Sequence, residues 1–197
     1  MGKLAICMAV VCAIGMSAVA AAATPPEIAA EQIQVQNPQN TIIGGPGNQR
    51  MAQVFRMHWA GAVSHLMLPI SCPANVVVRV TIEASTAGVP NGQVLALQDV
   101  PGHVLDGYVW SSGAGMRMVE FARPARLQPG EYAFTVSMLT QNKFKPSCTF
   151  WTGPVGETYG YGRGFFMASF NGPAWVELFD ASGATRDLAF QVYARPN

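Results

Sequence analysis

Alternation of apolar and polar residues, with a period of two, constrains the fold of this chain more than any other feature. The clearest run covers 76–83, where Val or Ile occupies every second position and polar residues fill most positions between them. The same alternation recurs over 62–70, 116–121, 132–139 and 187–194. Successive side chains of a strand point to opposite faces, so each run predicts a half-buried β-strand.

Short segments rich in glycine and proline separate these runs. They lie at 88–92, 101–102, 128–130 and 180–183, and Gly and Pro at such positions favour tight turns. No apolar stripe with helical spacing is longer than two turns. About eight to ten short strands without intervening helices predict a single all-β domain, an antiparallel β-sandwich that is jelly-roll-like.

The first 23 residues predict a secretory signal peptide. Lys3 precedes an uncharged, largely apolar stretch that ends in Ala-x-Ala arrangements at 18–20 and 21–23, as signal peptides do before their cleavage site. A retained membrane anchor is the alternative, but a spanning helix needs roughly 20 apolar residues and the strongly apolar part here is shorter. We therefore expect a secreted or periplasmic mature chain, with no membrane insertion because no second long apolar stretch follows.

The residues after the predicted signal peptide divide into two parts. The segment 24–48 is rich in Pro, Gln and Asn and ends in several glycines, which is typical of a tether. Short strands at 33–35 and 41–43 are compatible with its sequence. The period-two pattern begins near residue 51, so we expect the sandwich domain to cover 49–197, a length that suits one hydrophobic core.

Two of the four cysteines, Cys72 and Cys148, lie outside the predicted signal peptide. In an exported chain the simplest prediction for such a pair is a disulfide. The alternatives are two free thiols or two metal ligands. Neither cysteine has a second Cys or a His nearby, so we expect no metal site here.

The charge of the chain is balanced, with 12 Lys and Arg against 11 Asp and Glu. Basic residues form no run and do not alternate with aromatic residues. Nucleic-acid-binding proteins normally concentrate positive charge in a patch or stripe, so we do not expect a nucleic-acid partner.

Four short motifs follow one another along the chain. They are Asn-Gln-Arg-Met-Ala-Gln-Val-Phe at 48–55, Ala-Gly-Val-Pro-Asn-Gly-Gln-Val-Leu-Ala at 87–96, Arg-Leu-Gln-Pro-Gly-Glu-Tyr at 126–132 and Asp-Leu-Ala-Phe-Gln-Val-Tyr at 187–193. In this order they resemble the motifs of bacterial extracellular jelly-roll modules, known as choice-of-anchor or carbohydrate-binding-like β-sandwich domains. The resemblance implies a jelly-roll sandwich with an extracellular, non-enzymatic role, and implies little about the ligand. The segment around Cys148 and the lack of a C-terminal sorting signal depart from the family pattern.

The segment 150–175 holds the most conspicuous candidate for a binding site, because it carries eight aromatic residues separated by glycines. Exposed aromatic rings in a loop offer flat faces on which sugar rings stack, and an arginine beside them donates hydrogen bonds to hydroxyl or carboxylate groups. The alternative is that these aromatics are core residues under a long loop. The candidate binding residues are Trp151, Tyr159, Tyr161, Arg163 and Trp175.

Catalysis has weaker support in the sequence. The chain has three histidines, His58, His65 and His103, but no Gly-x-Ser-x-Gly nucleophile motif. No two acidic residues have a spacing that indicates the carboxylate pair of a glycosidase. Regular acid spacing that would signal a calcium loop is absent as well. We therefore expect a non-catalytic binding module, without a cofactor, for a glycan or a cell-envelope component; the alternative is a structural or protein-interaction accessory subunit.

Overall fold

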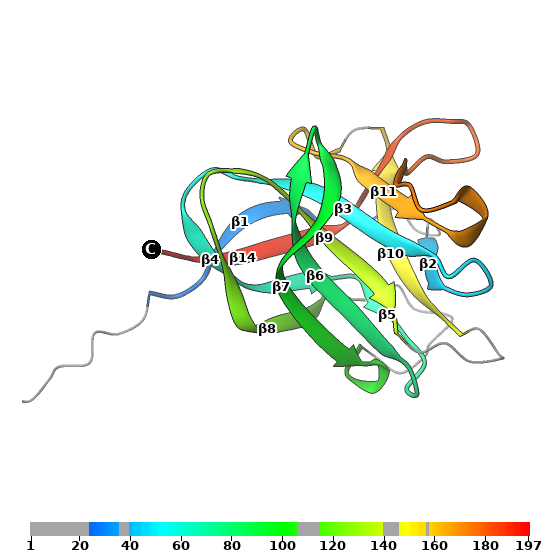
Figure 1. Ribbon diagram of the computed structural model, residues 1–197, viewed down its shortest axis with the longest axis horizontal. Helices are drawn as coiled ribbons and strands as arrows, with labels where there is room; N and C mark the ends of the chain where they lie inside the picture. Colours follow the sequence, from blue (N-terminus) through cyan, green and yellow to red (C-terminus); the bar gives the residue numbers. More distant parts are fainter. Residues whose placement is uncertain (1–23, 36–39, 106–114, 140–145, 157) are drawn as a thin grey trace, which may run out of the picture.

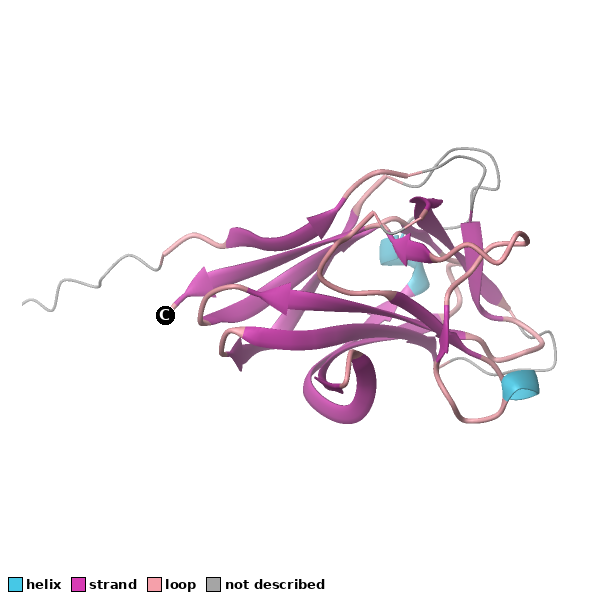
Figure 2. Ribbon diagram, turned by 90° about the horizontal axis from the view of Figure 1, so that it is seen from above, coloured by secondary structure: helices cyan, strands magenta, loops and turns pink. Residues whose placement is uncertain are grey.

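The computed structural model describes residues 24–35, 40–105, 115–139, 146–156 and 158–197, and the predicted signal peptide lies outside them. Figure 1 shows strands throughout the fold, interrupted only by short connections. The helical segments of the described residues are two 3-10 turns, η1 (Gly102–Leu105) and η2 (Ser169–Asn171), visible as the small cyan pieces of Figure 2. Neither has the length and hydrophobicity that crossing a membrane requires.

Antiparallel strands of the described residues form three sheets, and this confirms the predicted all-β sandwich. A four-stranded sheet has the order β1-β14-β4-β8, a six-stranded sheet has the order β12-β11-β3-β9-β6-β7, and β10 joins β13, β2 and the short β5. The bounds are β1 Glu27–Gln32, β2 Asn40–Gly44, β3 Arg50–Met57, β4 Gly61–Leu68, β5 Ile70–Ser71, β6 Val77–Thr86, β7 Val89–Pro101, β8 Arg117–Leu127, β9 Gly130–Met138, β10 Ser147–Val155, β11 Gly164–Met167, β12 Val176–Glu177, β13 Arg186–Leu188 and β14 Phe190–Pro196.

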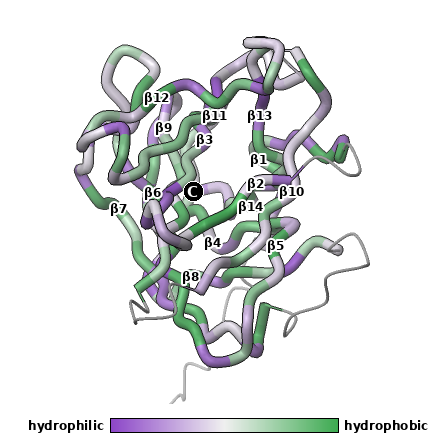
Figure 3. Tube along the Cα trace, turned by 90° about the vertical axis from the view of Figure 1, so that its right-hand side faces the viewer, coloured by the Kyte–Doolittle hydropathy of each residue, from purple (hydrophilic) through white to green (hydrophobic). Residues whose placement is uncertain are grey.

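The main hydrophobic core lies between the four-stranded and six-stranded sheets. Phe134 of β9 and Phe190 of β14 meet across it with their ring centroids 5.4 Å apart, and both are fully buried. Val78, Val80 and Ile82 of β6 face this core, as the alternation over 76–83 predicts. Figure 3 shows hydrophobic and hydrophilic positions interspersed along the strands.

The segment 24–48 differs from the expected tether. Its strand β1 pairs with β14, and β2 pairs with β10, so both are part of the sandwich. Ala29, Ala30 and Ile43 of these strands are buried in the main core. The strand compatible with 33–35 lies instead at Glu27–Gln32, whereas the one at 41–43 falls within β2.

The turn between β6 and β7 also differs from expectation. The hairpin turns at Ala87 and Gly88, which both have positive φ. Of the expected turn 88–92, only Gly88 therefore lies in the turn itself. Pro90 and Gly92 lie inside β7, where the register with β6 is irregular. Since β7 is the edge strand of its sheet, a proline without an N–H group costs no ladder hydrogen bond on its open side.

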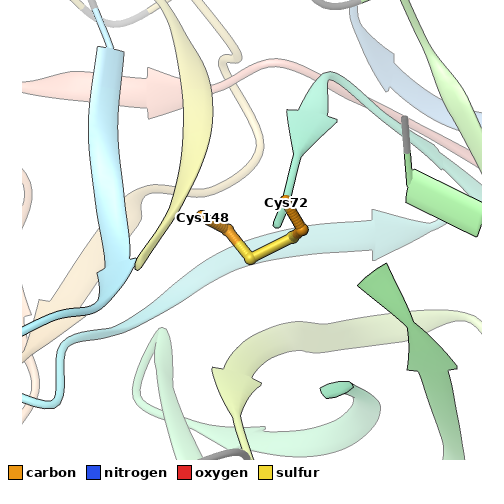
Figure 4. Close-up of a disulfide and its surroundings, with 2 residues drawn as sticks. All are labelled: Cys72 and Cys148. Atoms are coloured by element: carbon orange, nitrogen blue, oxygen red, sulfur yellow. A yellow bond between two sulfur atoms is a disulfide. The ribbon is translucent and has the colours of Figure 1, made fainter. Parts of the chain in front are cut away.

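A disulfide joins Cys72, directly after β5, to Cys148 of β10 (Figure 4). The two Cα atoms are 4.3 Å apart and 76 positions apart in sequence, and both residues are completely buried. The bond confirms the predicted pairing. It links the sheet around β10 to the segment that leads into β6, next to the main core.

Candidate binding cleft

A cleft of about 550 Å³ opens on the outer face of the six-stranded sheet, the face opposite the main core. Its floor consists of Val54 and Arg56 of β3, Glu131 of β9 and Phe165 of β11. One wall is the turn of the β6–β7 hairpin at 87–89, and the other is the loop 159–163 together with Glu177 of β12. We call this site the tyrosine cleft.

The loop 159–163 lies directly on β3, and Gly162 makes this contact possible. A Cβ atom at residue 162 would overlap the carbonyl oxygen of Val54 and come within 2.6 Å of its carbonyl carbon. The backbone N–H of Val54 donates to the carbonyl oxygen of Arg163 at 2.9 Å. A glycine is therefore required for the loop to approach the strand this closely.

Asp187 anchors the start of the loop from below. Its Oδ2 accepts hydrogen bonds from the backbone N–H groups of Thr158 and Tyr159, at 3.0 and 2.9 Å, and its Oδ1 accepts one from Nε2 of Gln53 at 2.9 Å. Burial raises the pKa of the Asp187 carboxyl, and these hydrogen bonds act in the opposite direction. Gln53 in turn accepts from the backbone N–H of Leu188, so the network ties the loop to β3 and β13.

Tyr159 is buried beneath the cleft and does not offer an open surface for stacking. Its side chain is only 7% exposed, and its ring packs edge-on against Phe190 of the main core at 5.2 Å. The hydroxyl oxygen accepts a hydrogen bond from the backbone N–H of Arg56 at 3.1 Å, and burial raises the pKa of this hydroxyl. The alternative that sequence analysis left open, a core role, applies to this residue.

Tyr161 presents an exposed aromatic ring to the cleft. It is 52% exposed, and its ring meets those of Tyr159 and His58 edge-on, at 5.9 and 4.9 Å. Edge-to-face contacts of this kind are favourable and restrict ring rotation. The ring is thus held in one orientation while about half of its surface stays open to solvent.

Charged groups of both signs surround the Tyr161 ring. Nη1 of Arg163 donates to Oε2 of Glu177 at 3.1 Å, and the arginine side chain is 56% exposed. Oε1 of Glu177 is buried and has no hydrogen-bond partner among the described residues. Arg56 and Glu131 are directly opposite each other in the register of β3 and β9, and both are exposed. The cleft therefore offers hydrogen-bond donors and acceptors side by side.

The structure separates the five candidate binding residues. Tyr159, Tyr161 and Arg163 line the cleft. Trp175 packs on the outer face of the sheet against a small apolar cluster that includes Val54 and Phe165, and borders a neighbouring hollow. Trp151 is 6% exposed on β10, outside the residues that line the cleft, because its strand belongs to another sheet.

Sequence analysis missed Arg56, Glu131, Glu177 and the 87–89 turn. Arg56, Glu131 and the 87–89 turn are distant in sequence from the aromatic segment, and only strand pairing brings them to it, whereas Glu177 follows that segment directly. One signal was present: Arg56 follows a hydrophobic run in β3, at a position that alternation assigns to the outer face. Among the described residues, no group of three or more His, Cys, Asp or Glu side chains is arranged to hold a metal ion.

Comparisons with known proteins show similarity in structure alone. No protein-family model matches the chain, and no curated protein matches it in sequence. A variant of the clostridial cysteine protease Cwp84 after propeptide cleavage superposes with a TM-score of 0.57 over 87% of this chain and 40% of that one, at 13% identity. A second structure superposes with a TM-score of 0.52 at 13% identity, over 82% of this chain and 37% of that one. It comprises the cysteine protease and lectin-like domains of Cwp84, a surface-layer-associated protein of Clostridium difficile. The chain thus spans less than half the length of these neighbours, and it has in common with them an all-β sandwich fold.

Proposed function

We propose that this protein is a secreted or periplasmic, non-catalytic module that binds a glycan of the cell envelope through the tyrosine cleft. The observation that carries the proposal is the exposed, oriented ring of Tyr161 in a cleft that is also lined by the Arg163–Glu177 ion pair and by the cross-strand neighbours Arg56 and Glu131. A binding site for a small polar ligand typically combines apolar or aromatic surface with a few placed polar groups.

The chemistry of the cleft suits a polyhydroxylated ligand. Each sugar hydroxyl both donates and accepts hydrogen bonds, so a guanidinium and a carboxylate placed side by side satisfy both roles, and hydrogen bonds to charged groups are the stronger kind. The apolar C–H face of a sugar ring packs on the exposed face of Tyr161.

Two further observations support an envelope role. The buried Cys72–Cys148 disulfide is typical of proteins that fold in an oxidising compartment. One structural neighbour contains a lectin-like domain of a surface-layer-associated protein.

A glycan array followed by calorimetric titration of the hits tests this proposal. Tyr161→Ala is expected to weaken binding about tenfold, equivalent to ~1.4 kcal/mol, because it removes the stacking face. Phe179→Ala is the matched control, since Phe179 is also 52% exposed but does not line the cleft. Equal affinities of the two variants would refute the site. A protein that binds no glycan but forms a stable complex with an envelope protein would refute the glycan function and favour the structural or protein-interaction alternative.

A further inference from the structure

A second hollow, of about 360 Å³, lies on the same outer face of the six-stranded sheet. Its floor includes Arg50 of β3 and Thr135 and Ser137 of β9. These residues have the same strand parity as Val54, Arg56 and Glu131 in the tyrosine cleft, and therefore point to the same side of the sheet. We call this hollow the threonine hollow.

The two cavities have the same walls. The β6–β7 hairpin contributes Gly88 and Val89 to the tyrosine cleft and Gly92 and Val94 to the threonine hollow. On the other side, the β11–β12 segment contributes Phe165 and Glu177 to the first, and Met167 and Trp175 to the second. The cavities thus follow one another along β3 and β9 rather than facing different directions.

A small, buried apolar cluster lies between them, on the outer side of the sheet. Ala52 and Val54 of β3 and Ala133 of β9 are no more than 1% exposed, because Val89 and Trp175, one from each wall, pack against them. The half-buried indole of Trp175 therefore stands between the two cavities.

The distance spanned by the two cavities follows from strand geometry. Arg56 lines the tyrosine cleft and Arg50 lines the threonine hollow, six residues apart on β3. At about 3.3 Å per residue their Cα atoms are roughly 20 Å apart, which is several sugar rings in length.

The threonine hollow has an ordered polar lining. Glu83 is only 8% exposed; its Oε1 accepts from the hydroxyl groups of Thr81 and Thr135, at 2.9 and 3.3 Å. Its Oε2 accepts from the backbone N–H of Gly92, and the two threonine oxygens are 2.7 Å apart. The hydroxyl protons are therefore used within this cluster, so the threonines offer acceptor lone pairs toward the hollow.

Charges are balanced along the whole floor and its walls. Asp99 holds Arg79 through two hydrogen bonds of 2.8 Å, as Glu177 holds Arg163 in the tyrosine cleft. A strongly acidic polymer has no surplus of positive charge to bind here, whereas an uncharged, hydroxyl-rich chain finds donors and acceptors throughout.

We propose that the tyrosine cleft and the threonine hollow are two subsites of one track for an extended, uncharged oligosaccharide chain, which crosses Trp175 between them and reaches the threonine hollow as its distal subsite. The inference rests on the proposed function and specifies its ligand class: an internal stretch of a linear glycan rather than a single terminal sugar. Each cavity contributes an aromatic face, Tyr161 or Trp175, beside a guanidinium.

Length series of oligosaccharides test this track. Linear glucose, xylose and N-acetylglucosamine oligomers, each from disaccharide to hexasaccharide, are titrated against the wild type, Arg50→Ala and Ser137→Tyr. Arg50→Ala removes a donor of the distal hollow, and Ser137→Tyr fills it from an outward-facing position of β9. Arg123→Ala is the control, because Arg123 is exposed on β8 of the other sheet.

In the wild type we expect affinity for the bound series to rise tenfold or more from the shortest to the longest oligomer. Both hollow variants should lose this rise but keep the wild-type affinity for the shortest oligomer, whereas Arg123→Ala should behave as the wild type. Binding that depends on Tyr161 but not on chain length, or that all variants share, would overturn the track and leave the proposed function standing. Absence of binding in all three series would overturn both.

Discussion

The close contact of Gly162 with β3 predicts that an alanine at this position destabilises the fold, and a second glycine of the same loop provides a matched control. Replacing Gly162 with Ala places a methyl group against the carbonyl group of Val54, which is backbone and cannot swing aside. The loop must lift from the strand, and the 2.9 Å hydrogen bond from the N–H of Val54 to the carbonyl of Arg163 is lost. Overpacking of this kind costs about 1–3 kcal/mol, and a lost buried hydrogen bond costs about 1 kcal/mol more.

Gly160→Ala is the matched variant, two positions earlier in the same loop. A Cβ atom there meets nothing within 4 Å, so the free energy of unfolding should change by no more than about 0.5 kcal/mol. Gly162→Ala should lower it by about 2–4 kcal/mol, which for a chain of this size lowers Tm by roughly 5–15 °C.

Denaturant titration and thermal melts measure both variants, and the titration with the best glycan ligand measures their affinity. Gly162→Ala should also weaken ligand binding, because Tyr161 and Arg163 flank the displaced residue. Equal stability and equal affinity of the two alanine variants would refute the conclusion that the loop rests on β3.

Three further predictions concern the stability of the fold that supports the site. Replacing Cys72 and Cys148 together with Ala should cost about 2–5 kcal/mol of unfolding free energy, because it opens a long loop; a denaturation midpoint equal to that of the oxidised wild type would contradict this. Asp187→Asn should destabilise by about 1.5–3 kcal/mol, since an amide group cannot accept from donors at both of its atoms, and denaturant titration measures this change. Burial lowers the pKa of His65 below its ordinary 6.5. The unfolded chain therefore binds the proton more readily, and the contribution of His65 to stability, complete above pH 6.5, decreases as the pH falls through the lowered pKa. His65→Phe, which keeps a ring stacked on Tyr193, should flatten that part of the curve of unfolding free energy against pH.

The strands were predictable wherever burial is one-sided. The run 76–83 falls largely within β6 and 132–139 largely within β9, and in both strands alternate residues enter the main core. The segment 24–48 was misinterpreted because β1 and β2 are short and rich in polar residues. Their place in the sandwich depends on pairing with β14 and β10, more than a hundred residues away in the chain, and no local pattern encodes that pairing.

The same physics explains which part of the site was visible in the sequence. Tyr159, Tyr161 and Arg163 are neighbours in the chain, so their composition marks them. Arg56 and Glu131 meet only because β3 and β9 pair in a particular register, and a slip of β3 by one residue would turn Arg56 toward the core.

The register of β3 and β9 is therefore a condition of the proposed function as well as of the fold. On the inner face, Met51, Phe55 and Phe134 fill the core and fix which face each strand turns inward, because a one-residue slip of β3 would bury its two outer arginines. With the register fixed, the outer positions of β3 carry a guanidinium at each end and small or branched apolar residues between them. The core thus determines where the charged groups of the track lie, which explains how a site assembled from four distant segments acquires a defined geometry.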